Sequence, residues 1–303
     1  MPDDACAASP VDPPDVASVP GGLVLVSTPI GNLGDVSARA RETLAGCDLV
    51  LCEDTRHSAV LLSALGVRAR TEPLHEYNED ARIPAVLALL RAGKRVALVS
   101  DAGTPLLSDP GFRLVRAVIA EGLLVSAVPG PNAALTALVL SGLPPVPFLF
   151  LGFPPPRAAA RRAAFGRLRA QEHAGLAATL IWHEAPHRLA ETLADMAAAF
   201  GDRSAAVARE LTKRFEEVRR GGLVDLAAWA GREPVRGELT VLVGPAATEA
   251  TDAATLDARL RTALAEGSVK DAAALVTVAT GLPRKVVYAR ALALAAEDGR
   301  GMG

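Results

Sequence analysis

The chain has 303 residues, half of them apolar, which is enough for two ordinary domains with a sizeable core. Its 32 basic and 34 acidic residues leave a net charge of −2, which neither requires nor excludes a nucleic-acid partner. Residues 1–20 are rich in Asp and Pro without Lys or Arg, which predicts a disordered tail and excludes a secretory signal. The most apolar stretch, residues 133–153, is interrupted by three prolines, so we expect a cytoplasmic protein without a membrane span.

Short β-rich runs alternate with longer helical periods from residue 23 onward, which indicates βαβ units around a mostly parallel sheet and an α/β fold. The first α/β domain is predicted over residues 21–142. Its expected strands are Leu23–Ser27, Leu49–Cys52, Arg95–Ser100 and Leu123–Val128. Turn-forming residues follow each strand, and the carboxyl ends of parallel strands share one edge of a sheet, where open α/β folds bind ligands.

A hinge rich in proline, residues 142–147, separates this domain from a second α/β domain predicted over residues 143–247. The expected strands of the second domain are Phe148–Leu151, Thr179–Trp182, Ala205–Ala208, Phe215–Val218 and Leu239–Val243, with helices near 157–171, 186–199 and 223–230. Residues 248–303 are predicted to form a small helical extension similar to a helix-turn-helix. Its expected helices are Thr255–Glu266, Val269–Thr280 and Pro283–Ala296, with Ser268 and Pro283 as helix starts and Gly267 and Gly281 as stops.

Three predicted strands end in loops that could carry chemistry. The first, Ser27 to Asp35, has glycines that allow a close approach to a ligand, with Asp35 as a possible cap of the next helix, although a plain turn explains it equally well. The second, Glu53 to Ser58, holds Glu53, Asp54, Arg56 and His57, which are either a functional cluster or a helix cap.

The third loop, Ser100 to Gly111, is long and rich in turn residues, which favours a binding element. After the next strand, Pro129-Gly130-Pro131-Asn132 opens a helix whose free amides could meet a carboxylate.

The segment His183 to His187 matches the H-E-x-x-H pattern of zinc proteases, which requires both histidines on one continuous helix. Pro186 disfavours helical geometry at Ala185, so we expect His183 at a strand end, His187 in the next helix, and no metal. Two groups of basic residues, between Arg157 and Arg169 and between Arg209 and Arg220, are either solvated faces or contacts for a phosphate backbone.

Taken in order, these motifs resemble the ribosomal RNA small subunit methyltransferase I family of the tetrapyrrole methylase-like superfamily. The matching segments are Thr28 to Leu33, Glu53 to His57, Ser100 to Pro105 with Asp109 to Gly111, Pro129 to Pro131, His187-Arg188, Ala208 to Lys213, and Gly237-Glu238. The resemblance implies a two-domain class III methyltransferase fold with S-adenosylmethionine in the cleft between the domains, commonly as a homodimer. It also implies 2′-O-methylation of a cytidine in the decoding region of 16S rRNA, with the 30S subunit as partner.

The cofactor loops of the superfamily map by position onto this sequence, more loosely in the second domain. They fall on Ile30, Gly31, Asp101, Gly103, Thr104, Pro105, Leu107, Asn132, Ala133, His183, Glu184, Glu210, Leu211, Gly237, Glu238 and Leu239. One departure is His183, because the family usually has a Tyr at this position.

Methyl transfer needs the acceptor oxygen aligned with the methyl donor and relieved of its proton. We therefore expect Glu53, Asp54, Arg56, His57 and Asp101 to act in catalysis, with the individual base left open. Arg56, Arg188, Arg209 and Lys213 are the predicted substrate contacts. Two alternatives remain: a methylase of a corrinoid or sirohaem precursor, and a non-catalytic RNA-binding or assembly protein.

Overall fold

A computed structural model describes residues 21–232, 234–246, 253–280 and 282–300. The predicted tail, residues 1–20, and Gly281 lie outside the described residues. The chain forms two compact units, the first comprising residues up to Leu140 with Ala208–Val218 and Gly237–Thr240, and the second the remainder. The domain boundaries expected from the sequence stay a prediction. Within the described ranges, no helix is both long and apolar enough to cross a membrane.

The first unit is built around a five-stranded sheet in the order β3-β2-β4-β1-β5, in which every pairing is parallel. The strands are β1 (Leu23–Val26), β2 (Leu49–Cys52), β3 (Thr71–Pro73), β4 (Val96–Val99) and β5 (Val125–Val128). The helices are the 3₁₀ turn η2 (Leu33–Asp35), α1 (Ala38–Ala45), α2 (Thr55–Ala64), α3 (Glu79–Arg91), α4 (Phe112–Ala120) and α5 (Ala133–Ser141), of which Ser141 already belongs to the second unit. Because the strands are parallel, their carboxyl ends lie at one edge of the sheet.

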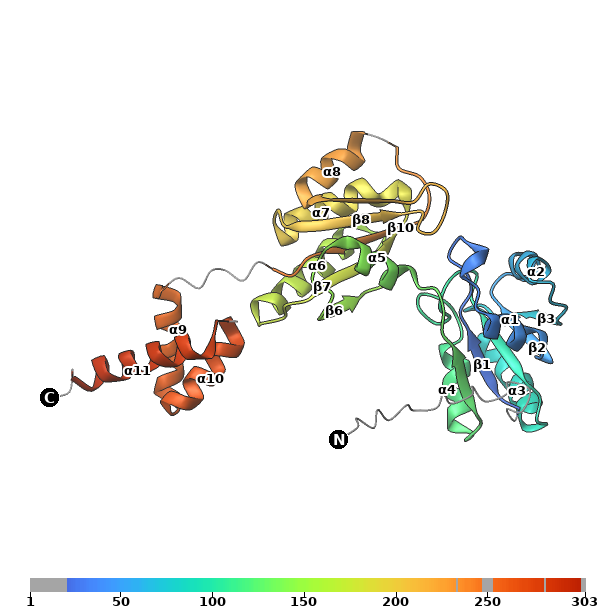
Figure 1. Ribbon diagram of the computed structural model, residues 1–303, viewed down its shortest axis with the longest axis horizontal. Helices are drawn as coiled ribbons and strands as arrows, with labels where there is room; N and C mark the ends of the chain where they lie inside the picture. Colours follow the sequence, from blue (N-terminus) through green and yellow to red (C-terminus); the bar gives the residue numbers. More distant parts are fainter. Residues whose placement is uncertain (1–20, 233, 247–252, 281, 301–303) are drawn as a thin grey trace, which may run out of the picture. The chain divides into compact units, whose positions relative to one another are not determined.

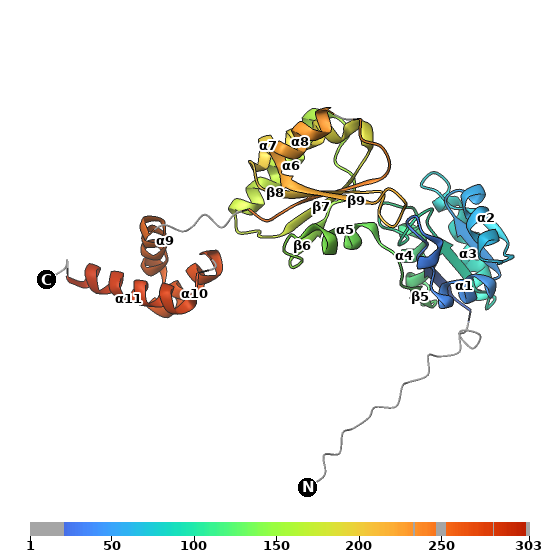
Figure 2. The same ribbon diagram turned by 45° about the horizontal axis from the view of Figure 1, so that its top comes forward.

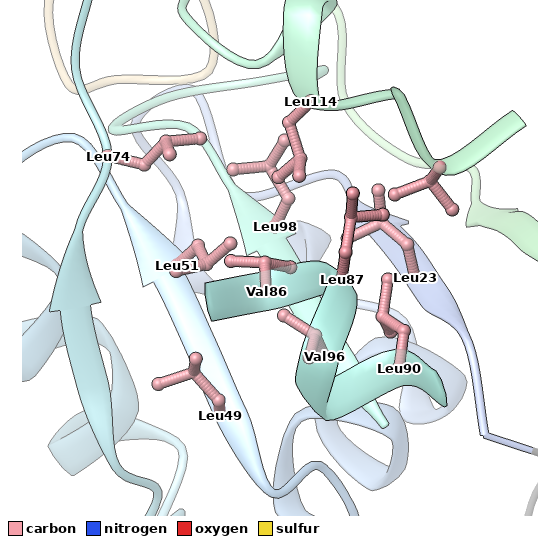
Figure 3. Close-up of a cluster of buried hydrophobic side chains, with 11 residues drawn as sticks. Leu23, Leu49, Leu51, Leu74, Val86, Leu87, Leu90, Val96, Leu98 and Leu114 are labelled. Atoms are coloured by element: carbon pink, nitrogen blue, oxygen red, sulfur yellow. The ribbon is translucent and has the colours of Figure 1, made fainter. Parts of the chain in front are cut away.

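Strands β2 and β4 are buried at every position, because successive side chains point to opposite sides of the sheet and helices cover both of these sides. Leu49 and Leu51 of β2 pack with side chains of α3 and α4, while Val50 and Cys52 pack with those of α1 and α2. Figure 3 shows the first of these two clusters, with Val86, Leu87 and Leu90 of α3 facing the strand leucines. The two apolar layers fix the sheet, and hence the position of the loops at its carboxyl edge.

The second sheet has five strands in the order β6-β7-β10-β8-β9. These strands are β6 (Phe148–Phe150), β7 (Thr179–Glu184), β8 (Ser204–Arg209), β9 (Glu217–Gly222) and β10 (Leu239–Val243). The helices are α6 (Ala158–His173), the 3₁₀ turn η3 (Pro186–Arg188), α7 (Leu189–Phe200) and α8 (Leu223–Arg232). Phe165 of α6, Trp182 of β7 and Phe200 of α7 are buried and in contact, and α7 and α8 lie side by side over one face of the sheet (Figure 2).

Three helices, α9 (Ala253–Glu266), α10 (Val269–Thr280) and α11 (Arg284–Arg300), pack around a core of their own (Figure 1). Ser268 caps α10, because its hydroxyl accepts a hydrogen bond from the amide of Asp271 at 3.2 Å. The three predicted helices of this region are confirmed, and so is the helix start at Ser268.

The structure corrects four sequence predictions. Asp35 does not cap the first helix: it lies in η2, and Ser37 caps α1 by accepting from the amide of Ala40 at 3.1 Å. The strand predicted at Phe215–Val218 begins instead at Glu217, because residues 210–216 form the connection from β8. The predicted helix 186–199 starts with a 3₁₀ turn, so His187 lies in η3. The sequence analysis missed β3, an edge strand of three residues whose Pro73 is tolerated because no further strand pairs beyond it.

Candidate active site

The loops after β1 and β4 are joined by a short antiparallel bridge at the carboxyl edge of the first sheet. The amide of Thr28 donates to the carbonyl of Gly103 at 2.9 Å, and the amide of Gly103 donates to the carbonyl of Thr28 at 3.1 Å. The hydroxyl of buried Ser100 donates to the carbonyl of Gly103 at 3.1 Å, and the Thr28 hydroxyl donates to the carbonyl of Ser100 at 3.2 Å. These hydrogen bonds therefore fix the start of the Ser100 to Gly111 loop against the loop that follows β1.

Thr104 connects this pair of loops to the loop after β5. Its hydroxyl donates to the carbonyl of Pro131 at 3.2 Å and accepts from the side-chain amide of Asn132 at 3.3 Å. The side-chain oxygen of Asn132 also accepts from the amide of Leu135 at 3.0 Å, which caps α5. Three loops that are distant in sequence thus form one hydrogen-bonded network.

The backbone of this network lies too close to its neighbours for larger residues. A β-carbon added to Gly130 would come within 2.9 Å of Cβ of Ser27, and one added to Gly103 would lie 3.2 Å from a methyl carbon of buried Ile30. Leu106 and Ser108 in the same loop have φ values of 74° and 76°, which non-glycine residues rarely adopt. Such backbone strain is concentrated at functional sites, which favours this loop as part of one.

A fourth loop, residues 210–216, belongs to the first unit as well. Lys213 Nζ lies 2.9 Å from a carboxylate oxygen of Glu210 and 3.2 Å from one of Glu238, and its alkyl chain lies against Gly31. The hydrogen bond from Lys213, together with that from the amide of Glu238, holds the pKa of Glu210 below its ordinary value. Thr212 has φ 65°, and its hydroxyl oxygen is buried without a hydrogen-bond partner among the described residues.

Two of the predicted catalytic residues bind each other. Asp54 caps α2 by accepting from the amide of Arg56 at 2.8 Å, and its carboxylate also pairs with the Arg56 guanidinium at 2.9 Å. These two bonds to Arg56 lower the pKa of Asp54 to about 2. Asp54 is therefore ionised and bound to Arg56. It caps α2, which was one of the two interpretations of this segment from the sequence. His57 is exposed on the first turn of the same helix.

Three carboxyl groups around the end of β4 form a coupled acidic cluster: Glu53, Asp101 and Asp109. Burial, together with the nearby charges of Glu53 and Asp101, raises the pKa of Asp109 to about 6. Burial, with the charge of Asp101 next, also raises the pKa of Glu53. Asp101 accepts from the amide of Asp54 at 3.3 Å, which ties the loops after β2 and β4 together. Like charges held at one place favour retention of a proton, and such a group can exchange protons near neutral pH.

In the second unit, His183 lies near the carboxyl end of strand β7, between two phenylalanines. Its ring centroid is 4.9 Å from that of Phe150 and 5.7 Å from that of Phe153, which is exposed. The amide of His183 donates to the carbonyl of Gly152 at 3.0 Å, so the segment after β6 follows β7. The structure thus places an aromatic group at this strand end, although the sequence supplies His instead of Tyr.

The side chains of Glu184 and Arg188 are directed into the protein. Glu184 is buried and accepts from the hydroxyl of Thr192 and from the amide of Ala185, and Arg188 Nε lies 3.3 Å from its carboxylate. Arg188 also donates to the carbonyl of Pro154 at 2.8 Å. The assignment of both residues as ligand contacts stays a prediction, and a ligand at Glu184 would have to use its main chain.

The H-E-x-x-H pattern does not form a helical pair, because His183 belongs to a strand and His187 to a 3₁₀ turn. Over the described part of the chain, no group of three or more His, Cys, Asp or Glu side chains is arranged to hold a metal ion.

The cations predicted to contact substrate have partners within the chain. Arg56 pairs with Asp54, Arg209 pairs with Glu217 at 2.9 Å, and Lys213 pairs with Glu210 and Glu238. Within residues 210–216, Arg214 and Phe215 are instead exposed, and the guanidinium carbon of Arg214 lies 5.5 Å from the centroid of the Phe215 ring.

The structure brings many of the predicted residues of the first unit together. Ile30, Gly31, Gly103, Thr104 and Asn132 lie in the loop network, and Pro105, Leu107 and Ala133 follow them in the same loops. Leu211, Gly237 and Leu239 belong to the segments of the first unit that carry Lys213 and Glu238.

Sequence reasoning did not assign roles to Asp109 or Phe215. Asp109 stands in the matched Asp-Pro-Gly motif, which was a usable signal, and Phe215 adjoins the matched motif that ends at Lys213.

The sequence and the fold were compared with those of known proteins. Residues 22–227 match the model of the Tetrapyrrole (Corrin/Porphyrin) Methylases, and residues 250–295 match that of the RsmI C-terminal HTH domain. Among solved structures, cobalt precorrin-4 methyltransferase covers 73% of the chain at 18% identity with a TM-score of 0.55. A uroporphyrin-III C-methyl transferase from Thermus thermophilus, complexed with S-adenyl homocysteine, covers 74% at 20% identity with a TM-score of 0.51. At these identities the likeness shows the fold.

Curated relatives are much closer in sequence. A protein of Mesorhizobium japonicum named ribosomal RNA small subunit methyltransferase I is 47% identical over 93% of this chain and 95% of its own length. A protein of the same name from Pseudomonas aeruginosa is 45% identical over 90% of this chain and 97% of its own length. Since both the methylase fold and the helical extension are matched as well, the chain belongs to the ribosomal RNA small subunit methyltransferase I family of the tetrapyrrole methylases.

Proposed function

We propose that this protein transfers the methyl group of S-adenosylmethionine to the 2′-hydroxyl of a cytidine in the decoding region of 16S rRNA. The observation that carries the proposal is the relationship to proteins named ribosomal RNA small subunit methyltransferase I, which extends over nearly the whole chain. A structural neighbour of the same fold is described as complexed with S-adenyl homocysteine, the product form of this methyl donor.

The loop network of the first unit suits such a cofactor. Gly103 and Gly130 let the loops after β1, β4 and β5 pack closely against one another, and the buried hydroxyl oxygen of Thr212 has no partner among the described residues. The Leu135 amide donates to Asn132, whereas the amides of Ala133 and Ala134 have no acceptor within α5 and can bind a carboxylate. We propose that Ile30, Gly103, Thr104, Asn132 and Ala133 form the core of this site, and that Glu210, Leu211 and residues 237–239 of the same unit complete it. When bound, S-adenosylmethionine supplies an activated methyl group.

The acceptor hydroxyl must lose its proton during transfer. We propose that the acidic cluster of Glu53, Asp101 and Asp109 accepts it, because the raised pKa of Asp109 lies close to neutral pH. Asp54 and Arg56 then have a positioning role: Asp54 caps α2 and its amide donates to Asp101.

Arg214 and Phe215 offer an exposed cation and an exposed ring to the RNA, a combination that binds unpaired nucleotides.

The alternative substrate, a corrinoid or sirohaem precursor, is suggested by the titles of the structural neighbours. It has less support, because those neighbours are 18–20% identical, whereas the rRNA methyltransferase relatives reach 47% and include the helical extension. The same relationship argues against a non-catalytic assembly protein.

The test is a labelled-methyl assay with 30S subunits, free 16S rRNA and a tetrapyrrole precursor as acceptors. We expect incorporation into the ribosomal acceptors, mapped to a ribose, and none into the precursor. Labelling of the precursor alone, or no affinity for S-adenosylmethionine in calorimetry, would refute the proposal.

We also infer that the protein acts in the cytoplasm as a homodimer, as the family resemblance implies. Two exposed apolar side chains on α4, Phe112 and Ile119, are our candidates for the surface that a second copy would cover. Sedimentation of the wild type and of a Phe112→Asp, Ile119→Asp double variant tests this inference. A wild type that sediments as a monomer at micromolar concentration would overturn it.

A further inference from the structure

Helix α11 presents a continuous outward face with an unusual composition. Its exposed residues recur at helical spacing and include two cations, one aromatic ring, one leucine and two alanines. These residues are Arg284, Lys285, Tyr288, Ala289, Leu292 and Ala296. We call this set the α11 face. Val286 and Glu297 are exposed on α11 as well, and Glu297 pairs with Arg290 and Arg261. Among the described residues, neither Arg284 nor Lys285 has an ion pair.

The opposite side of α11 is firmly held. Val287, Ala291 and Leu294 are fully buried in the core of the three-helix unit. Arg290 pairs with Asp257 of α9 and lies 3.6 Å from Glu297. The charges of Arg290 and Glu297 are therefore paired within the three-helix unit. The rotation of α11 about its axis is therefore fixed, and the α11 face is held toward the outside.

The place of α11 in the helical unit gives this face a meaning. Helix α10 ends at Thr280, and α11, the next helix in the chain, begins at Arg284 (Figure 1). In a helix-turn-helix the second helix carries the residues that meet nucleic acid, especially in its first turns. Arg284, Lys285 and Tyr288 occupy those turns. The exposed Leu275 lies on α10, outside this face.

We propose that the α11 face binds the RNA substrate, with Arg284 and Lys285 on phosphates and the Tyr288 ring against an unpaired base. Ala289, a small residue beside Tyr288, lets a nucleotide backbone approach the helix closely, and an aromatic ring next to cations is an arrangement that binds single-stranded RNA. This inference rests on the proposed function, because that function makes ribosomal RNA the partner.

The experiment uses the full-length protein and a fluorescent transcript of the 16S rRNA decoding region, with binding measured by anisotropy over a range of salt concentrations. The test variants are an Arg284→Glu, Lys285→Glu double variant and Tyr288→Ala. The matched control is an Arg259→Glu, Arg261→Glu double variant on α9, which changes the net charge equally. S-adenosylmethionine affinity, measured by calorimetry, and circular dichroism verify each preparation.

We expect the α11 double variant to bind RNA at least about tenfold more weakly and to lose roughly one to two units of the salt slope. The control double variant should stay within about twofold of the wild type. Tyr288→Ala should weaken binding about fivefold or more without changing the salt slope, and Tyr288→Phe should restore it, since the ring and not the hydroxyl makes the contact.

Equal weakening by the α9 control, or unchanged RNA binding by both α11 variants, would overturn the inference. Unchanged RNA binding with lost methylation of 30S subunits would also overturn it, in favour of a protein partner. In each of these cases, the proposed function still stands if the wild-type protein methylates RNA and the variants keep their affinity for the cofactor. Failure of the wild type to methylate RNA would instead refute the proposed function. Should the double variant not fold, Lys285→Ala and Tyr288→Ala decide the outcome.

Discussion

The side chain of Lys213 lies directly against the backbone of Gly31, so that a β-carbon added to Gly31 would come within 2.3 Å of Cγ of Lys213. Gly31 follows β1, whereas Lys213 follows β8. This contact, with the ion pairs of Lys213 to Glu210 and Glu238, holds the 210–216 loop against the loop that follows β1. It makes Gly31 a point where a minimal substitution tests the site.

Gly31→Ala should force Lys213 away and lower the affinity for S-adenosylmethionine by about tenfold or more, equivalent to about 1.4 kcal/mol. Calorimetric titration measures this. The control is Gly166→Ala on α6, where an added β-carbon meets nothing within 4 Å. That variant should bind normally and gain about 0.5–1 kcal/mol of helix stability. Wild-type affinity for Gly31→Ala would show that the contact has no part in binding.

Lys213→Met should destabilise the protein in a pH-dependent manner. Because Lys213 lowers the pKa of Glu210, its contribution is present above the ordinary glutamate pKa and is lost as the pH falls through the lowered value. We expect a loss of about 1 kcal/mol near pH 7 that shrinks toward zero near pH 3, measured by urea unfolding. Lys94→Met, which removes an exposed pair with Asp48, should cost less than about 0.5 kcal/mol. A loss for Lys213→Met that does not vary with pH would contradict this account.

Asp109→Asn should have the opposite pH dependence. The pKa of Asp109 is raised to about 6, so the protonated form is favoured in the fold, and its stabilising contribution is lost as the pH rises through about 6. Since Asn imitates the protonated acid, the variant should exceed the wild type in unfolding free energy by about 1 kcal/mol near pH 8 and equal it near pH 4. Its methyl transfer should fall by about 100-fold.

Asp48→Asn is a suitable comparison for this measurement. The amide of Arg95 and the side chain of Lys94 lower the pKa of Asp48, so its loss should destabilise the protein above about pH 4 and have no effect well below that value. If both Asp variants respond to pH with the same sign, the cluster around Asp109 does not have the proposed electrostatics.

Glu184→Ala should act mainly on stability. The partly buried Arg188 would lose its carboxylate partner, and the hydroxyl of Thr192 and the amide of Ala185 would lose their acceptor. We expect a cost of about 3 kcal/mol in thermal or urea unfolding, against about 1 kcal/mol for Thr192→Val, which removes one hydrogen bond. A stable Glu184→Ala protein without cofactor affinity would show that the carboxylate itself binds the ligand.

Phe215→Ala should weaken the acceptor RNA and leave the cofactor unaffected. The ring is exposed and lies against the Arg214 guanidinium, so its removal costs little stability, while a lost stacking contact is worth about 1–3 kcal/mol per base. The KM for the RNA acceptor should rise about tenfold, with partial recovery in Phe215→Tyr. Val224→Ala, another exposed apolar position, should leave that KM unchanged. An equal rise in both variants would remove Phe215 from the RNA contact.

Sequence patterns located the elements that are apolar throughout. The runs Leu49–Cys52 and Leu239–Val243 are buried at every position, so their composition alone indicated strands, and both predictions are confirmed residue for residue. Helix Val269–Thr280 is confirmed as well, since Ser268 supplies its cap. Strand Thr71–Pro73 was missed because an edge strand of three partly buried residues has no apolar run, and its pairing with β2 is what makes it a strand.

The sequence by itself determined the family, the α/β class and the motifs that lie at strand ends, because these depend on local composition and on the order of residues. Only the tertiary structure decided which groups meet. It paired Arg209, Lys213 and Arg56 with carboxylates, turned Glu184 inward, and set Asp109 beside Glu53 and Asp101. Such pairings depend on distances between residues far apart in the chain, which the packing of helices on sheets fixes and no local pattern encodes.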